Sequence, residues 1–571
     1  MKAMLQYIGK HSRRYFHIFS IAFLISLVSS IIHVYSSLII KKAIESLNID
    51  RNFSIFLHFI VIFLLLNLIV RIFSVFSSFL INFYRRNLIK DMQISLFQKI
   101  LNINLLDYSK RRLGDYVSRI THDIPSISSI LPDSLLDIFK HFVILLGATY
   151  IIGRFDSMSV VFTAIFVIIM ILISFYGGGI VEQFNFTLRR KLSEVMGALL
   201  EPLFNLPIVR AYNMQTHLSD MFKKILNGAI KIQIKMGIFR SVINNLNVIL
   251  ALFMTVVLLL RAGYLHVTYN TISVGTMFAL LYLSSMITQS ISVIVSGLVS
   301  IKTARPAFNR IKEILNLKTE DIGKGGEISS SEINIVNLEF GYTDNNMVLK
   351  GINMCIKAGS RIGIVGKSGA GKSTLIKILL GFYRNYSGYI YLGDRELKEV
   401  SLKKLRDFIT YIPQEDFIFP GTIRDNMVLV KPDATDEEIE EALNKAGLYK
   451  YISLLPSGIY TEITDAKFLL SGGERQRLSI ARAFLKGGEI FIFDEALGQI
   501  DAITEKEIFD ATMELVKDKT LIVIAHRIST VARLDKIFVL DSGRIIAEGR
   551  HETLINESVF YKKLCELQLI K

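Results

Sequence analysis

The stretch LLSGGERQRLSIARAFLKGGEIFIFDEALGQID, from Leu469 to Asp501, decides the fold of the second half of this chain. It joins a Ser-Gly-Gly turn and a basic helix to an apolar strand that ends in Asp494 and Glu495. Further upstream, GKSGAGKST follows the apolar strand RIGIV directly. This segment has the pattern GxxxxGK[ST] of a phosphate-binding loop. Because short strands alternate with helices around both segments, we expect an α/β domain with a parallel sheet.

The phosphate-binding loop is expected to hold phosphates through its backbone and through two side chains. Its glycines let backbone N–H groups approach the phosphates, and the helix that follows adds its N-terminus. Lys372 is expected to contact the β- and γ-phosphates, and the Ser373 hydroxyl to ligate Mg²⁺. The loop residues are Gly366, Lys367, Ser368, Gly369, Ala370, Gly371, Lys372, Ser373 and Thr374.

The strand EIFIFDE is too apolar to tolerate charge anywhere but at its end, where carboxylates can meet a cation. We expect Asp494 to act on Mg²⁺, and Glu495 to act as the general base for an attacking water. An Asp-Glu pair alone is usually a solvated strand end. The phosphate-binding loop in the same chain favours the catalytic interpretation.

The first half of the chain is strongly apolar. Hydrophobic residues make up 51% of the 571 residues, and the mean hydropathy is +0.42. Six stretches are long and apolar enough to span a bilayer, and no cleavable signal peptide is evident. They cover approximately 16–40, 55–80, 136–153, 157–181, 243–262 and 272–298.

Charge is unevenly placed along the chain, and its distribution predicts orientation. Residues 1–320 carry 33 Lys and Arg against 15 Asp and Glu, whereas residues 321–571 carry 33 against 36. The excess gathers before the first stretch and in the long loops after the second and fourth, which should therefore be cytoplasmic, with both termini inside. Nucleic-acid binding is not expected, because the basic residues lie in these loops. The two cysteines fit a reducing compartment.

Taken together, these features resemble an ATP-binding cassette (ABC) transporter of the exporter type. The resemblance implies a six-helix membrane domain over 1–302, a linker over 303–332 and an α/β P-loop ATPase domain over 333–571. The long inner loops resemble coupling segments that dock on the ATPase domains. Their tips read YSKRRLGDYVSRITHDI, with Gly114, Asp115, Arg119 and Asp123 matching the usual pattern, and EPLFNLPIVRAYNMQ.

The resemblance also assigns roles around the nucleotide. Ser471, Gly472, Gly473 and Glu474 match the family signature, which completes the ATP site of the opposite subunit. Tyr342 resembles the aromatic residue that stacks on adenine, Gln414 the γ-phosphate sensor that links Mg²⁺ to the membrane domain, and His526 the switch histidine. Asp501 resembles an aspartate at the dimer interface. Three of these residues also have ordinary structural explanations: Tyr342 as a tyrosine at a sheet edge, Gln414 as a polar loop residue, and His526 as a histidine at a strand end.

Two loops depart from the family pattern. Gly498 replaces a serine after the catalytic glutamate, which leaves that loop's interface hydrogen bond in doubt. Before the signature, Thr464, Asp465, Ala466 and Lys467 stand where exporters often have a glycine-containing sequence. Coupling at that loop is therefore uncertain, whereas the residues expected to carry the chemistry are present.

Polar side chains within the apolar stretches are candidates for a translocation cavity, because a charge in the membrane is costly. These are Arg71, Lys140, His141 and Gln289. The alternatives are an internal ion pair, a side chain that reaches the membrane surface, or a frayed helix boundary. Gly177 to Gly179 are expected to permit close packing or a bend.

We expect ATP-driven export by a homodimer, because one chain has one phosphate-binding loop and one signature; a heterodimer stays open. ATP binding would clamp the nucleotide domains and swing the membrane helices outward. A finished peptide is favoured as substrate, since too few residues precede the first stretch for a fused peptidase, and a lipid or an amphiphilic drug is possible. Composition favours a bacterial cytoplasmic (inner) membrane. The alternatives are an importer of this fold, such as one for siderophores, and a regulator or channel that does not pump.

Overall fold

The chain folds into two compact units in the computed structural model, which describes residues 2–111, 113–320, 325–343, 346–414, 416–463, 470–495, 502–524 and 528–569. We call the first the helical unit; it comprises Met1–Leu101 and Arg111–Asn316. The second, the α/β unit, comprises Asn102–Lys110 and Leu317–Lys571. A short segment of the first inner loop therefore belongs with the α/β unit.

The helical unit is built from long apolar helices. Among the described residues, six helical segments are long and apolar enough to cross a membrane, as the sequence predicted, and each contains or overlaps one of the six expected stretches. Its helices are α1 (Lys2–Ser12), α2 (Phe16–Asn48), α3 (Phe53–Leu101), α5 (Leu113–Ser118), α6 (Ile124–Ser128), α7 (Leu136–Phe155), α8 (Ser157–Phe204), α9 (Leu206–Ala211), α10 (Gln215–Tyr269) and α11 (Val274–Leu315).

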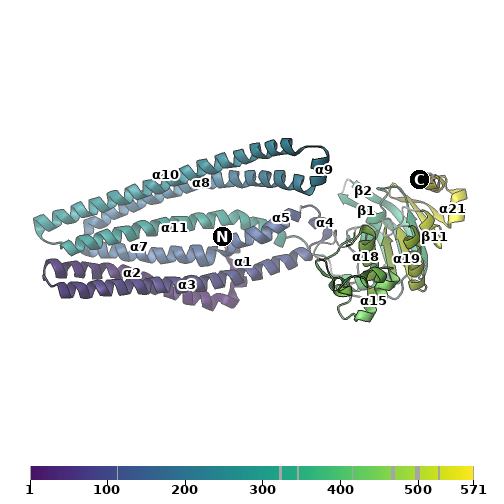
Figure 1. The fold of residues 1–571 in the computed structure, drawn as a ribbon, viewed down its shortest axis with the longest axis horizontal. Coiled ribbons are helices and arrows are strands. Elements are labelled where there is room, and N and C mark those ends of the chain that lie inside the picture. The colour runs from purple at the N-terminus through teal and green to yellow at the C-terminus, as the bar shows by residue number, and fades with distance from the viewer. Residues whose placement is uncertain are drawn as a thin grey trace. The chain divides into compact units, whose positions relative to one another are not determined.

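The helices pair along their length. Figure 1 shows α8 and α10 side by side in an arm that ends in the short helix α9, with α2 and α3 forming another pair. Gly177 lets α8 approach α10 closely, because a Cβ atom there would lie 2.4 Å from Cδ1 of Ile243. Apolar side chains at the tip of the arm are exposed, Phe204 at 81% and Tyr212 at 74%. That this tip docks on an ATPase domain stays a prediction.

The first inner loop returns to the bundle through two π-helical turns, Arg119–Asp123 and Ile130–Leu135. Two buried charges in the first turn attach it to α11. Arg119 donates to the backbone oxygen of Arg310, and Arg310 donates from Nε to Oδ2 of Asp123 at 2.8 Å. Asp115 accepts from Arg119 at 2.8 Å. The Gly-Asp…Arg…Asp pattern thus corresponds to a charge network within the helical unit.

Helix α11 continues without a break past residue 302, where the sequence suggested the end of the membrane domain. Its buried positions keep a helical period through Ala304, Ala307, Phe308 and Ile311, so packing against the bundle extends the helix to Leu315.

The α/β unit contains the parallel sheet that the sequence predicted. A six-stranded sheet has the order β12-β11-β3-β10-β9-β6, in which only β12 is antiparallel to its neighbour. A four-stranded antiparallel sheet has the order β2-β1-β4-β5. The strands are β1 (Ile333–Thr343), β2 (Asn346–Ile356), β3 (Arg361–Val365), β4 (Ser387–Leu392), β5 (Arg395–Glu396), β6 (Ile409–Ile412), β7 (Gly421–Thr422), β8 (Glu462–Ile463), β9 (Ile490–Asp494), β10 (Thr520–Ile524), β11 (Lys536–Asp541) and β12 (Arg544–Gly549).

Helices surround these sheets, as Figure 1 shows for α15, α18 and α19. Strands β9 and β10 of the large sheet are buried along their whole length, as expected of strands covered on both faces. The helices are α4 (Leu105–Tyr108), α12 (Lys372–Leu379), α13 (Leu402–Phe408), α14 (Ile423–Val428), α15 (Asp436–Lys445), α16 (Tyr449–Ile452), α18 (Gly472–Lys486), α19 (Ala502–Leu515), α20 (Ile528–Val531), α21 (His551–Glu557) and α22 (Val559–Leu569).

The segment Asn102–Lys110 pairs with the chain that leads out of α11. The backbone N–H of Asn104 donates to Lys318 at 3.1 Å, and that of Glu320 donates to Asn102 at 2.9 Å. Leu105 and Leu106 pack against the apolar core of the α/β unit. This contact lies just before the tip that the sequence analysis singled out.

Candidate active site

The phosphate-binding loop leaves β3 and enters α12, as its motif predicted. Two of its glycines are required by the geometry. At Gly366 a Cβ atom would lie 2.1 Å from the backbone oxygen of Leu540, and Gly371 has φ of +107° at the start of α12. Neither position accepts an ordinary side chain without strain. The loop can therefore bring its backbone N–H groups and the helix N-terminus close to an anion.

Lys372 is folded back over this loop. Its Nζ donates to the backbone oxygens of Gly366 at 2.8 Å and Lys367 at 3.1 Å, and only 6% of the residue is exposed. Burial lowers the pKa of this ammonium group, while the carboxylates of Glu495 and Asp494 act in the opposite direction. A buried cation with one donor left over is suited to an incoming phosphate.

Asp494 ends β9 and is 4% exposed. Its Oδ2 accepts a hydrogen bond from the hydroxyl of Tyr411 at 3.1 Å. Sequence reasoning missed Tyr411; β6 and β9 pair in a register that sets it opposite Ile492, so that it shares a face with Asp494 two residues on. Burial raises the pKa of the Asp494 carboxyl, and the charge of Glu495 raises it further, whereas the Tyr411 bond lowers it.

The second oxygen of Asp494 indicates what the site can bind. Oδ1 is buried and has no hydrogen-bond partner among the residues that the structure describes. A buried carboxylate oxygen without a partner is costly, and a hard cation would satisfy it. Asp494 therefore fits the Mg²⁺ role expected of it, and Ser373, in the first turn of α12, supplies the hydroxyl that the motif assigns to the ion.

Glu495 follows β9 in a left-handed conformation, with φ of +55°. A non-glycine residue seldom adopts this conformation, which costs about 1–2 kcal/mol and is typical of functional sites. Its Oε2 accepts a hydrogen bond from Nε2 of Gln414 at 2.6 Å. The structure thus brings the expected general base and the expected γ-phosphate sensor into direct contact.

Tyr342, expected to stack on adenine, lies near the end of β1 and is 37% exposed. Its hydroxyl is hydrogen-bonded to that of Thr374 in the phosphate-binding loop, at 3.0 Å. Its ring meets those of Phe340 and Tyr383 edge to face. An exposed aromatic ring attached to the phosphate-binding loop is placed well for stacking on a base.

The signature begins α18. Ser471 is its N-cap, and Glu474 completes a capping box: Glu474 Oε2 accepts from the backbone N–H of Ser471 at 2.6 Å. Glu474, the last of these signature residues, thus helps to cap this helix. Gly472 and Gly473 form the first turn, where N–H groups are free for an anion.

Not all of the expected residues meet. Among the residues that the structure describes, no hydrogen bond or ion pair joins 471–474 to the loop 366–374. His526 and Asp501, and the unusual residues Gly498 and Thr464 to Lys467, lie outside the described residues. The structure therefore brings Lys372, Asp494 and Glu495 close to one another, and no hydrogen bond or ion pair among the described residues joins the signature to the phosphate-binding loop.

The helical unit contains a cavity of about 630 Å³ between α8, α10 and α11. Gln289, singled out in the sequence, lines it together with other neutral hydrogen-bonding side chains. The polar lining residues are Asn244, Asn247, Thr255, Ser284, Ser285, Thr288, Gln289 and Ser292. Such a wall suits a polar but uncharged part of a ligand.

Fold and site together define a P-loop ATPase fused to a unit of membrane-spanning helices. Two family descriptions match the chain, "ABC transporter transmembrane region" over residues 19–291 and "ABC transporter" over residues 349–498. An ATP-dependent lipid A-core flippase of Syntrophus aciditrophicus is 29% identical, over 99% of this chain and 94% of its own. The lactococcin-G-processing and transport ATP-binding protein LagD of Lactococcus lactis is 30% identical, over 83% and 68%.

The fold is shared with a bacterial Atm1-family ABC exporter solved with ATP bound, at a TM-score of 0.84 and 22% identity, over 97% of this chain and 98% of that one. The chain belongs to the ABC transporter family. It is a multi-pass integral membrane protein of the exporter type, and its α/β unit binds ATP and couples hydrolysis to transport.

Proposed function

We propose that this protein exports its substrate as a homodimer, in a bacterial cytoplasmic membrane with both termini inside. The observation that carries the proposal is the division of the active site. Lys372, Asp494 and Glu495 lie together with Gln414, whereas among the described residues no hydrogen bond or ion pair joins the signature at Ser471 to them. A second copy, arranged head to tail, supplies the missing half of each site.

In this proposal each side chain has a defined task during hydrolysis. Lys372 exchanges the loop oxygens for phosphate oxygens, and its positive charge opposes the charge that develops on them. Glu495 orients the attacking water and accepts its proton. Gln414 is hydrogen-bonded to Glu495 in this structure. It senses the γ-phosphate by exchanging this hydrogen bond to Glu495 for one to the phosphate. Ser471 and the first N–H groups of α18 contact the same phosphate from the second copy.

The proposal includes Mg²⁺ at Asp494 and Ser373, with Gln414 beside it. The ion would neutralise the charge of the phosphate oxygens. Asp494 would hold it through Oδ1, which has no hydrogen-bond partner among the described residues, while the hydroxyl of Tyr411 donates to Oδ2. His526 and Asp501 are assigned by resemblance to the γ-phosphate contact and to the interface.

The sequence favours a finished peptide as the substrate, and a lipid or an amphiphilic drug is the alternative. The relative whose name refers to lipid A-core supports a lipid substrate. The relative whose name refers to lactococcin G supports a peptide substrate. Hydroxyl and amide groups along α10 and α11 provide hydrogen bonds for such a molecule.

Complementation between two inactive chains tests the homodimer. In a shared-site dimer, Lys372→Ala spoils both sites in its own homodimer, and so does Ser471→Arg. A mixed dimer has one site with both defects and one site with none. Co-purified mixed dimers in lipid nanodiscs should therefore regain a substantial part of the Mg²⁺-ATPase rate. If mixtures stay as inactive as either variant, the shared-site homodimer is wrong.

Vesicle uptake tests the direction of transport. In inverted vesicles, a pump of this orientation should accumulate peptides, lipids or amphiphilic drugs in an ATP-dependent manner, and Glu495→Gln should abolish that accumulation. ATPase activity without accumulation of any substrate would contradict the export function.

A further inference from the structure

The last helix of the chain contacts the phosphate-binding loop. The ammonium group of Lys367, the second residue of that loop, lies over the ring of Phe560 on α22, with Nζ 5.2 Å from the ring centroid. A cation within about 6 Å of an aromatic face is attracted by the negative charge of that face. The two residues lie far apart in the sequence, so this contact is produced by the tertiary structure of the α/β unit.

Helix α22 is anchored in the core of the α/β unit. Tyr561 is fully buried, and its hydroxyl is hydrogen-bonded to Nδ1 of His551 on α21 at 2.8 Å. Cys565, one turn later, is also buried, and both residues belong to the same apolar cluster as Val365, the last residue of β3. Phe560 is partly buried against this cluster. Its ring therefore has a fixed position beside the loop that follows β3.

Lys367 is also part of the structure that holds Lys372. Its backbone oxygen accepts a hydrogen bond from Nζ of Lys372 at 3.1 Å and another from the backbone N–H of Ala370 at 3.2 Å. A phosphate that takes Nζ of Lys372 would remove that donor from the Lys367 oxygen. The loop must therefore keep its shape while one of its internal hydrogen bonds is exchanged.

Backbone contacts fix the loop before and after Lys367. Gly366 packs on the backbone of Leu540, and the backbone oxygen of Ala370 accepts from the N–H of Gly543 at 3.1 Å. Residues 367–369 between these points are exposed. In the described part of the chain, the contact of Lys367 with the Phe560 ring is the one hydrogen bond, ion pair or ring contact that attaches residues 367–369 to anything beyond the loop and α12.

We propose that Phe560 is a positioning residue for ATP, which fixes the Lys367 side chain and thereby preorganises the phosphate-binding loop. Ordering a loose loop at the moment of binding costs conformational entropy, and a loop that is already ordered avoids this cost. The effect falls on binding and not on hydrolysis, because Asp494 and Glu495 are held by contacts of their own. The inference needs ATP binding alone, and neither export nor the homodimer.

A double-mutant cycle on the full-length chain in lipid nanodiscs tests this proposal. Phe560→Leu keeps an apolar side chain and removes the aromatic face, whereas Lys367→Met keeps a long side chain and removes the charge. KM and kcat of the Mg²⁺-ATPase are measured for each variant. The Kd for ATP is measured by displacement of a fluorescent ATP analogue in a Glu495→Gln background, in which ATP is not consumed.

Phe560→Leu should raise the Kd and the KM for ATP about two- to fivefold, the factor expected for one cation–π contact at an exposed site, and leave kcat unchanged. Phe560→Tyr and Phe560→Trp keep an aromatic face and should bind ATP as the parent chain does. When Lys367→Met is already present, Phe560→Leu should have no further effect, because the two side chains act as a pair.

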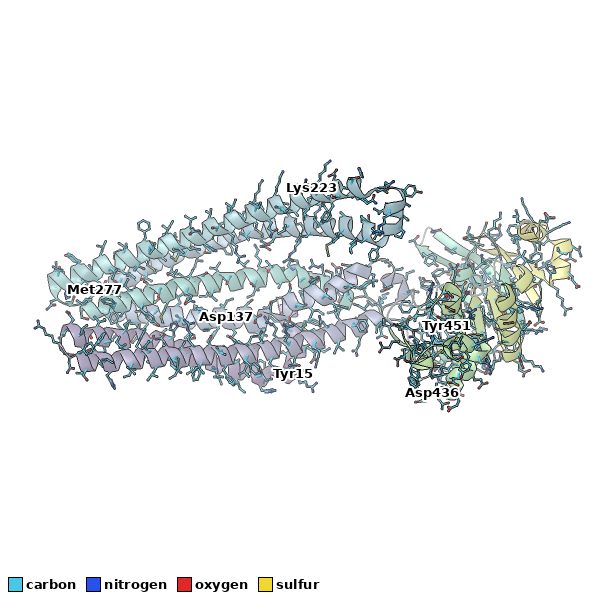
Figure 2. All side chains as sticks on the ribbon, viewed as in Figure 1. Tyr15, Asp137, Lys223, Met277, Asp436 and Tyr451 are labelled. Carbon is cyan, nitrogen blue, oxygen red and sulfur yellow. The ribbon has the colours of Figure 1, made fainter. Side chains whose placement is uncertain are left out.

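Two controls separate this pair from a general loss of a ring or a charge. Tyr460→Leu removes an exposed ring that is hydrogen-bonded to Asp436. Figure 2 shows Asp436 at the edge of the α/β unit away from the yellow C-terminal helices. Lys562→Met removes an exposed lysine from α22 itself. Neither control should change the Kd for ATP.

An unchanged Kd in Phe560→Leu would overturn the inference, and so would a double variant in which the two single effects multiply. A lower melting temperature with an unchanged Kd would give Phe560 a packing role alone, which also contradicts the proposal. Loss of affinity in Phe560→Tyr and Phe560→Trp as large as in Phe560→Leu would show that the aromatic face is not what matters. Because the Kd for ATP is measured without turnover or transport, failure of the proposed export function would leave this test unaffected.

Discussion

Gln414 and Glu495 are joined by a hydrogen bond of 2.6 Å, from the amide Nε2 to the carboxylate Oε2. Gln414, which is expected to sense the γ-phosphate, is therefore hydrogen-bonded to Glu495, which is expected to activate the attacking water. While this bond persists, one oxygen of the general base has a donor already. If nucleotide binding draws Gln414 away, Oε2 of Glu495 becomes free to accept a hydrogen bond from the attacking water. Binding of the γ-phosphate would in this way activate the general base.

Glu495→Gln should abolish turnover and spare nucleotide binding. The amide keeps the size of the side chain but cannot accept a proton, so kcat should fall by about 10²–10⁴. ATPase rates and nucleotide affinity, measured on the same preparation, separate the two effects. Glu489→Gln, at an exposed carboxylate just before β9 that pairs with Lys519, is the control and should retain activity. A residual rate above one tenth would show that another group acts as the base.

Tyr411→Phe should make the enzyme more sensitive to acid. Burial raises the pKa of Asp494, and the hydroxyl of Tyr411 opposes this rise. Without the hydroxyl the pKa of Asp494 rises further, and a protonated carboxyl cannot hold Mg²⁺. Activity is lost as pH falls through that pKa, so the acid limb of the pH–rate profile should move up by about one unit, since a hydrogen bond to a charged group is worth about 1.5–3 kcal/mol.

Mg²⁺ titrations of the ATPase rate at several pH values measure this shift. Tyr391→Phe, on the antiparallel sheet, controls for loss of a tyrosine hydroxyl. An unchanged Mg²⁺ requirement across the pH range would mean that Tyr411 does not act through Asp494.

Local motifs allowed most of the nucleotide site to be predicted, and long-range packing explains what was missed. Lys372, Asp494 and Glu495 belong to short patterns whose spacing is set by one strand and one turn. Tyr411 gave no signal, because its position depends on the register between β6 and β9.

The same distinction holds for the membrane half. Hydropathy identified the six spans because each is a continuous local signal. It did not reveal that Leu105 and Leu106 pack on the α/β unit, since this contact depends on tertiary structure. Residues 304–315 do have the pattern of an amphipathic helix, but the sequence did not show that this helix is the continuous end of α11, which runs to Leu315.

Breaking the charge network of the first inner loop should destabilise the helical unit. Asp123 is 3% exposed and accepts from Arg310 at 2.8 Å. Asp123→Asn leaves Arg310, which is 44% exposed, without its charged partner, which should cost about 1–2 kcal/mol and lower the temperature at which the helical unit unfolds. Glu194→Gln breaks an exposed pair with Lys191 and should cost less than about 1 kcal/mol. Exchanging the charges, Asp123→Arg with Arg310→Asp, should restore part of the loss if the pair itself matters.

Asp416 should destabilise the α/β unit at neutral pH. Burial raises its pKa to about 6, with Arg475 and Arg482 acting in the opposite direction, and its buried Oδ1 has no hydrogen-bond partner among the described residues. Because the pKa is higher in the folded chain than in the unfolded one, the folded state binds more protons between about pH 4 and pH 6. Stability therefore falls as pH rises through this window, and the penalty remains above it.

Asp416→Asn should accordingly raise the melting temperature of the α/β unit at pH 7.5 and have little effect at pH 4.5. Both arginines keep other partners, since Arg475 donates to Leu470 at 2.8 Å and Arg482 to Asn426 at 2.9 Å. Asp425→Asn is the opposing control, because hydrogen bonds from Thr422 lower the pKa of that carboxyl, and its loss should lower the melting temperature at pH 7.5. If Asp416→Asn instead lowers the melting temperature at pH 7.5, as Asp425→Asn should, the attraction of Asp416 to the charges of Arg475 and Arg482 outweighs its burial.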